Sequence, residues 1–171
     1  VLAYCGYDIH DLAKSATFEE VCYLLWHGRL PNRAELGDLQ SQLAASRPLP
    51  ESSLRLLRQI PASGGDGMDV LRTMTSALSH YDPDTADQSS AANYRKAVRL
   101  TAQIASLVAT HGRLQAGGGP IQADPALGHA ANFLYMLTGK RPTAIETRAF
   151  DIALVLHADH ELNASTFAAR V

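Results

Sequence analysis

The chain has 171 residues, of which 46% are hydrophobic and 19% charged, a composition typical of one ordinary globular domain. Fifteen Lys and Arg against seventeen Asp and Glu leave a formal net charge of −2. This near balance excludes a general attraction to nucleic acid or to an anionic membrane, and the apolar content excludes a disordered chain. Unbroken apolar runs, such as residues 152–156, are short, so we expect no membrane-spanning segment.

The cysteine content indicates a reducing compartment. The two cysteines, Cys5 and Cys22, form no Cys-x-x-Cys or Cys/His zinc pattern, and two thiols make a poor disulfide framework. We therefore expect a cytoplasmic protein. No basic segment followed by an apolar run stands at the start, which predicts that there is no signal peptide. The sequence begins with Val1 rather than Met, so we expect a fragment of a longer protein.

Helical periodicity dominates the sequence. Apolar residues at i, i+3, i+4 and i+7 follow Thr17, which forms a capping box with Glu20, and a second box joins Asn32 to Glu35. Proline and glycine end the segments. These signals predict helices that start near residues 18 and 32, and further helices near 54–60, 68–81, 91–114, 124–137, 142–156 and 164–171. Residues 1–4 are the strand candidate, so the predicted fold class is all-α with little or no β structure.

The helices predicted at 68–81 and 91–114 carry apolar residues on more than one face. In the longer helix, Leu100, Ile104 and Leu107 lie on a different face from the stripe that begins at Val98. A chain of this length has difficulty burying a long helix on every side. We therefore expect a homodimer that packs these two helices against their symmetry mates. Replacing Ile104 or Leu107 with Asp should break it if either residue faces the partner.

Two features that resemble anion or nucleic-acid sites have simpler interpretations. The glycine-rich stretches at 63–67 and 117–120 lack the Gly-Lys-Ser/Thr ending of a phosphate loop or a preceding strand, so they are interpreted as linkers. The basic residues Arg95, Lys96 and Arg99 have no interleaved aromatic residues, which favours a solvated helix face. We expect no nucleic-acid partner.

Polar residues are densest at 157–165, directly after an apolar helix. One interpretation is a metal site of His157, Asp159 and His160, but the His-Glu-x-x-His spacing is missing. A second interpretation is a structural joint in which Asp159 or Asn163 caps a helix. A third is a site for a small anion, with imidazole and amide donors directed at a carboxylate or carbonyl. The residues alone leave all three open.

Residues 156–170, LHADHELNASTFAAR, resemble the oxaloacetate-site segment of citrate synthases. Five further stretches resemble that family in the same order: GYDIHDLA at 6–13, FEEV at 18–21, LLWHG at 24–28, MDVLRT at 68–73 and NFLYML at 132–137. The resemblance covers essentially residues 1–171 and implies the N-terminal part of the large helical domain, with the small domain absent. One departure is Asp66-Gly67, where the family commonly has His-Pro.

The resemblance implies an acyltransferase of the tricarboxylic acid cycle that condenses acetyl-CoA with oxaloacetate to give citrate and CoA. Its alternatives are a 2-methylcitrate synthase that uses propionyl-CoA and a non-catalytic helical dimerisation module. The family's catalytic His, His and Asp lie beyond residue 171, so no catalytic residue is expected in this chain, which alone should be inactive. His160 matches a substrate-binding histidine, and Asn163 and Ser165 match residues that order the site. The resemblance implies no metal and no covalently bound cofactor, and it also implies a homodimer.

Overall fold

Helices account for nearly all regular structure in the computed structural model, which describes residues 2–60, 66–159 and 168. A two-stranded antiparallel hairpin opens the chain, with Ala3 opposite Asp8 and Tyr4 opposite Tyr7. The all-α prediction is therefore confirmed. In chain order, the elements are β1 (Ala3–Tyr4), β2 (Tyr7–Asp8), α1 (Ile9–Ser15), α2 (Phe18–His27), α3 (Arg33–Ser46), α4 (Glu51–Gln59), α5 (Gly67–Leu78), the 3-10 turn η1 (Ser79–Tyr81), α6 (Ser90–Gln115), α7 (His129–Thr138) and α8 (Ala144–Leu156).

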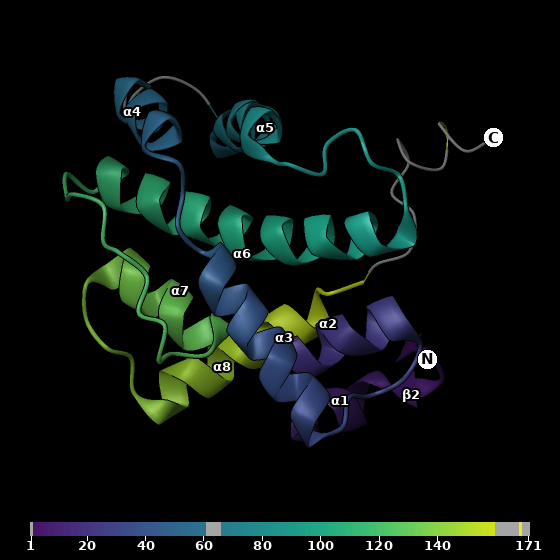
Figure 1. Ribbon diagram of the computed structural model, residues 1–171. Helices are drawn as coiled ribbons and strands as arrows, with labels where there is room; N and C mark the ends of the chain where they lie inside the picture. Colours follow the sequence, from purple (N-terminus) through teal and green to yellow (C-terminus); the bar gives the residue numbers. More distant parts are fainter. Residues whose placement is uncertain (1, 61–65, 160–167, 169–171) are drawn as a thin grey trace.

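The longest helix, α6, separates two groups of helices. In Figure 1, α4 and α5 lie on one side of α6, and α2, α3, α7 and α8 lie on the other. Helix α6 packs on α3, α5 and α7, while α8 packs on α1, α2 and α7. Among the described residues, no helix is long and apolar enough to cross a membrane.

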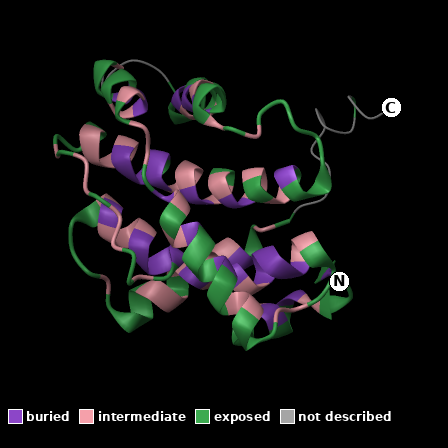
Figure 2. Cartoon of the chain, in the orientation of Figure 1, coloured by how far each residue is buried: buried purple, intermediate pink, exposed green. Residues whose placement is uncertain are grey.

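Three clusters of buried apolar side chains hold this arrangement together, and Figure 2 shows buried segments on α6 and on helices on both sides of it. The first joins β1, α1, α2 and α8 around Tyr4, Leu24 and Val155. The second joins α2, α3 and α6, and the third joins α4, α5 and α6. Leu107 belongs to the third cluster and is 2% exposed. It is therefore covered within one chain and cannot serve as the partner-facing residue of a dimer.

Helix starts follow the capping chemistry of the sequence. The two predicted capping boxes are present at Thr17 and Asn32, and a third, which the sequence analysis did not identify, starts α8 at Thr143. At the atypical Asp66-Gly67 pair, the Asp66 carboxylate accepts a hydrogen bond from the Met68 amide at 3.1 Å. Asp66 is thus the N-cap of α5.

The structure differs from the sequence prediction at one helix that was missed and at one helix start. Helix α1 was missed, because a seven-residue helix that buries only Ile9 and Leu12 leaves too short a stripe to show a period. The helix expected from residue 124 begins instead at His129. Asp124 forms a turn in which its carboxylate accepts from the Ala126 amide, and its own amide donates to Asn132 Oδ1. The expected helix at 164–171 lies outside the described residues, apart from residue 168.

The basic residues at the start of α6 hold the preceding turn. Arg99 donates to Asp82 Oδ1 at 2.7 Å and to Asp84 Oδ2 at 2.6 Å, and Arg95 also pairs with Asp84. These two guanidinium groups hold the pKa of Asp84 well below its usual range. The side chain of Arg99 is only 21% exposed. The interpretation of a solvated face is therefore wrong for Arg99, which anchors the α5–α6 connection.

Two charged residues on α8 form hydrogen bonds to α1 and α2, near the start of the chain. Arg148 donates to three carbonyl oxygens at the end of α1, those of Ala13, Lys14 and Ala16, at 2.6–2.8 Å. Asp151 accepts from the Phe18 amide at 2.9 Å and from Arg148 at 2.9 Å. One ion pair thus caps the end of α1 and the start of α2 together.

We expect Asp151→Ala to lower the free energy of unfolding by about 2–4 kcal/mol, because it leaves the Phe18 amide without its acceptor and removes the carboxylate partner of Arg148, which keeps only its carbonyl acceptors. The matched control is Asp69→Ala. Asp69 also pairs with an arginine three residues away, but its side chain is 60% exposed, so its loss should cost less than about 0.5 kcal/mol. Urea titration of both variants measures the difference, and equal losses would contradict the role assigned to the α8 pair.

Candidate functional site

The entry to the polar segment is fixed by a buried tyrosine. Tyr4 of β1 is 1% exposed. Its hydroxyl donates to the carbonyl of Asp159 at 3.0 Å and accepts from the Asp159 amide at 3.3 Å. The first strand of the protein therefore holds the backbone that leads into residue 160. His160, Asn163 and Ser165, the predicted substrate-binding residues, lie outside the described residues.

His157 ends α8 and is tied to that helix. Its ring Nδ1 lies 2.7 Å from the carbonyl oxygen of Ala153, so Nδ1 carries the proton and donates. This bond satisfies one of the free carbonyls at the helix end, which is a structural role. The metal interpretation required His157, Asp159 and His160 together, and His160 lies outside the described residues.

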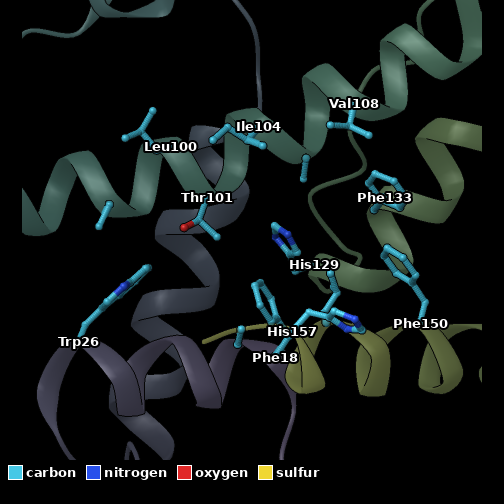
Figure 3. Close-up of a pocket in the computed structure, with 14 residues that line it drawn as sticks. Phe18, Trp26, Leu100, Thr101, Ile104, Val108, His129, Phe133, Phe150 and His157 are labelled. Carbon is cyan, nitrogen blue, oxygen red and sulfur yellow. The ribbon is translucent and has the colours of Figure 1, made fainter. Parts of the chain in front are cut away.

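A cavity of about 760 Å³ lies between α2, α6, α7 and α8. Figure 3 shows aromatic side chains along its floor, where the rings of Phe133 and Phe150 stack at 4.8 Å between centroids. Its other apolar lining residues are Phe18, Trp26, Ala97, Leu100, Ile104, Ala105, Val108, Leu154 and Ala158, and its polar ones are Thr101, His129 and His157. None of these described lining residues is Lys or Arg. A dicarboxylate would find no cationic partner here, so this cavity does not have the chemistry of an oxaloacetate site.

His129, the first residue of α7, lies at the centre of the view in Figure 3. It is 5% exposed, and its ring packs 5.1 Å from that of Phe18. Burial, reinforced by the positive charge of Arg47, lowers the pKa of His129 to about 4, so the imidazole is neutral at physiological pH. Sequence reasoning missed this residue, although its position beside the apolar NFLYML stretch was an available signal.

Buried charged residues lie near His129, one of the residues that line the apolar cavity. Glu19 is 4% exposed and accepts from the His129 amide at 2.8 Å, so it caps the start of α7. Arg47 is 3% exposed and donates to the Asp124 carbonyl at 3.0 Å. Burial lowers the pKa of Arg47 and raises that of Asp151. His129 also lines a second cavity of about 430 Å³, together with Glu19 and Asp151. These groups join α2, α3, α7 and α8 by polar contacts.

Comparison with known proteins identifies the class to which this helical scaffold belongs. A family model described as "Citrate synthase, C-terminal domain" matches residues 1–171. The chain is 48% identical to the citrate synthase of Haloferax volcanii and 44% identical to the 2-methylcitrate synthase of Mycobacterium tuberculosis strain H37Rv. Each match covers 99% of this chain, but only 46% and 42% of the respective relative.

A solved structure agrees with the sequence relatives. The citrate synthase from Pyrobaculum aerophilum superposes with a TM-score of 0.90 at 37% identity, over 98% of this chain and 44% of that one. The chain therefore belongs to the citrate synthase family, as the resemblance of residues 156–170 indicated. It spans less than half the length of the relatives that it matches.

The depressed pKa of His129 predicts a loss of stability in acid. The unfolded imidazole binds a proton below about pH 6.5, whereas the folded one does so only near pH 4. As the pH falls through this window, the unfolded state gains protons first, and His129 removes about 3 kcal/mol from the free energy of unfolding. His129→Gln should abolish this contribution. Urea titrations from pH 7 to pH 4 measure it.

The control for this experiment is His80→Gln, because His80 is exposed on η1. This variant should keep the pH dependence of the parent protein. If His129→Gln retained the full loss of stability between pH 7 and pH 4, the buried neutral state of His129 would be refuted.

Proposed function

We propose that this chain is part of a polypeptide that condenses acetyl-CoA with oxaloacetate, giving citrate and CoA. The observation that carries the proposal is membership of the citrate synthase family along residues 1–171, with 48% identity to a citrate synthase. In the reaction, a base removes an α-proton from acetyl-CoA, the enol carbon attacks the keto carbon of oxaloacetate, and the thioester is hydrolysed. The enzyme would act in the cytoplasm without a metal or a covalently bound cofactor.

This chain contributes substrate binding rather than proton transfer in the proposed reaction. His160 donates to the keto or hydroxyl oxygen of oxaloacetate, and Asn163 and Ser165 order the surrounding site. The hydrogen bonds between Tyr4 and Asp159 support this assignment, because they fix the backbone one residue before His160. The enolising residues and the arginines for the carboxylates belong to parts of the polypeptide outside these 171 residues.

A second candidate is 2-methylcitrate synthase. It is favoured by the 44% identity to a 2-methylcitrate synthase, which lies close to the 48% identity to a citrate synthase. The two enzymes differ by one methyl group on the acyl-CoA. One buried methylene changes transition-state binding by about 1–3 kcal/mol, or roughly 10–200-fold, which is enough for a clear kinetic distinction.

The proposed function predicts activity for the longer polypeptide and none for the 171-residue chain alone, because the enolising residues are absent from it. The assay follows thiol release from acetyl-CoA or propionyl-CoA in the presence of oxaloacetate. We expect the longer polypeptide to have a kcat/KM for acetyl-CoA at least about tenfold above that for propionyl-CoA. The reverse ratio would assign 2-methylcitrate synthase. Turnover by the 171-residue chain would overturn the assignment of the catalytic residues, and no turnover by either would favour a dimerisation module.

In the active polypeptide, we expect His160→Ala to weaken oxaloacetate binding roughly ten- to a hundredfold, since one donor to a polarised oxygen contributes about 1.5–3 kcal/mol. His157→Ala is the control, because the His157 ring is already bonded to the Ala153 carbonyl. It should change stability more than oxaloacetate affinity. Equal effects of both variants on the KM for oxaloacetate would remove the reason for assigning His160 to the substrate.

We also propose a homodimer that uses helices α5 and α6. The support is an apolar groove of about 330 Å³ between them, whose lining includes Met68, Leu71 and His111. Met68 is 66% exposed and adds apolar surface to this groove. Leu71→Asp should weaken the dimer without entering the core around Leu107. Light scattering that finds only monomers at micromolar concentration would contradict this assembly.

A further inference from the structure

The second cavity at His129, of about 430 Å³, lies where three helices begin. Its lining includes Thr17, the N-cap of α2, Gly128, the N-cap of α7, and Ala144, the first residue of α8. The first turn of a helix leaves backbone N–H groups without an acceptor inside the helix, so a cavity at helix starts offers hydrogen-bond donors. We call it the helix-start cavity.

Helix α7 brings two such donors to the helix-start cavity. The first amide of the helix, that of His129, donates to Glu19. The next two amides belong to Ala130 and Ala131, which line the cavity and are 4% and 9% exposed. In the part of the chain that the structure describes, neither amide has a hydrogen-bond acceptor. Because buried N–H groups are nearly always paired, these two favour a ligand that accepts hydrogen bonds.

A buried carboxylate supplies an acceptor at the same wall of the cavity. Glu19 is 4% exposed and lines the cavity, and its Oε1 accepts from the His129 amide at 2.8 Å. An added Cβ at Gly128 would meet that oxygen at 3.3 Å, so the carboxylate lies against the start of α7. Among the described residues, the other oxygen, Oε2, has neither a hydrogen-bond donor nor an ion-pair partner within 4 Å. It therefore favours a ligand that also donates.

The charges around the cavity favour a neutral ligand. Asp151 also lines the cavity, but its two oxygens accept from the Phe18 amide and from Arg148. Arg47 is buried within electrostatic range of Glu19, so two guanidinium groups balance two carboxylates. An anion would meet the free oxygen of Glu19, whereas a cation would meet Arg148 and the positive end of the α7 dipole. Either charge would be desolvated without a matched partner.

We propose that the helix-start cavity binds a small neutral molecule that carries a primary carboxamide. The carbonyl oxygen of the ligand accepts from the amides of Ala130 and Ala131, and its NH₂ group donates to Oε2 of Glu19. A carboxamide presents this acceptor and this donor side by side on one planar group. The rest of the ligand lies against Leu127 and Pro142, the apolar part of the lining. This binding requires only described residues and does not rest on the proposed function.

Three ligands of the same shape test the pattern of donors and acceptors. Butyramide is the probe, butyrate replaces its NH₂ group with a charged oxygen, and 2-pentanone replaces it with a methyl group. In the longer polypeptide, we expect butyramide to bind at least about tenfold more tightly than either, because only butyramide donates to the charged Glu19. Ligand-observed NMR titration measures the three dissociation constants. Equal constants, or no saturable binding of butyramide, would overturn the proposal.

Glu19→Gln should reverse the preference between butyramide and butyrate. The amide oxygen of Gln still accepts from the His129 amide, whereas an NH₂ donor replaces the free oxygen. We expect butyramide to bind about tenfold or more weakly and butyrate about tenfold or more tightly. Glu51→Gln is the matched control, because the Glu51 side chain on α4 is 61% exposed and should affect neither ligand. An unchanged preference, or an equal loss of both ligands, would overturn the proposal.

A second variant locates the ligand without altering Glu19. Ala144 is exposed and lines the cavity, so the indole of Ala144→Trp occupies space that the ligand needs. We expect this variant to weaken butyramide at least about tenfold. The control is Ile145→Trp at the next residue, which is 82% exposed.

Unchanged affinity of Ala144→Trp for butyramide would place the ligand elsewhere and overturn the proposal. If Glu19→Gln does not fold, as judged by its circular dichroism, the ligand series and Ala144→Trp decide. None of these titrations uses turnover. An inactive polypeptide that binds butyramide therefore refutes the proposed function alone, and an active one that does not bind it refutes this inference alone.

Discussion

The ion pair between Arg148 and Asp151 is the interaction on which the arrangement of the site depends. It joins α8 to the end of α1 and the start of α2, across more than 130 residues of sequence. Each partner also satisfies backbone groups that helix ends otherwise leave free. If α8 moved, the residues that follow it, including the backbone held by Tyr4, would move with it. The pair therefore fixes where the polar segment leaves the fold.

Helix α6 carries small side chains on the face that packs against α3 and α7 and larger ones on its open face. On the side facing α3 and α7, Ala102 and Ala109 are fully buried, and Gly112 lies so close to α7 that an added Cβ would meet Leu137 at 2.7 Å. Small residues there allow the helices to approach closely. On the open side, larger residues such as Ile104 have no complete cover within the described chain. The apolar residues on two faces of α6 thus have two causes. One face belongs to a core that the described chain completes, and the other lines an apolar surface that the described chain leaves partly open.

Local signals made most helices predictable, whereas long-range burial did not. The capping boxes at Thr17 and Asn32 depend on residues three apart, so the sequence displays them directly. Glu19 and Arg47 are buried by tertiary packing, which the sequence does not display, because charged residues are mostly exposed in folded proteins. Leu107 was placed on a dimer face for the converse reason, since periodicity shows that a face is apolar without showing which element covers it.

The sequence likewise does not show which tertiary contacts hold the candidate site. The motif at 156–170 identified the family, but a motif does not show what holds it in place. At its described beginning the structure shows one such contact, since the Tyr4 hydroxyl both donates to and accepts from the backbone of Asp159. A tyrosine in a two-residue strand carries no sequence signal for such a role. The backbone that leads out of α8 at Asp159 therefore depends on contacts from the opposite end of the chain, and the residues that hold it lie within the described part of this chain, whereas the apolar surface along α6 stays open.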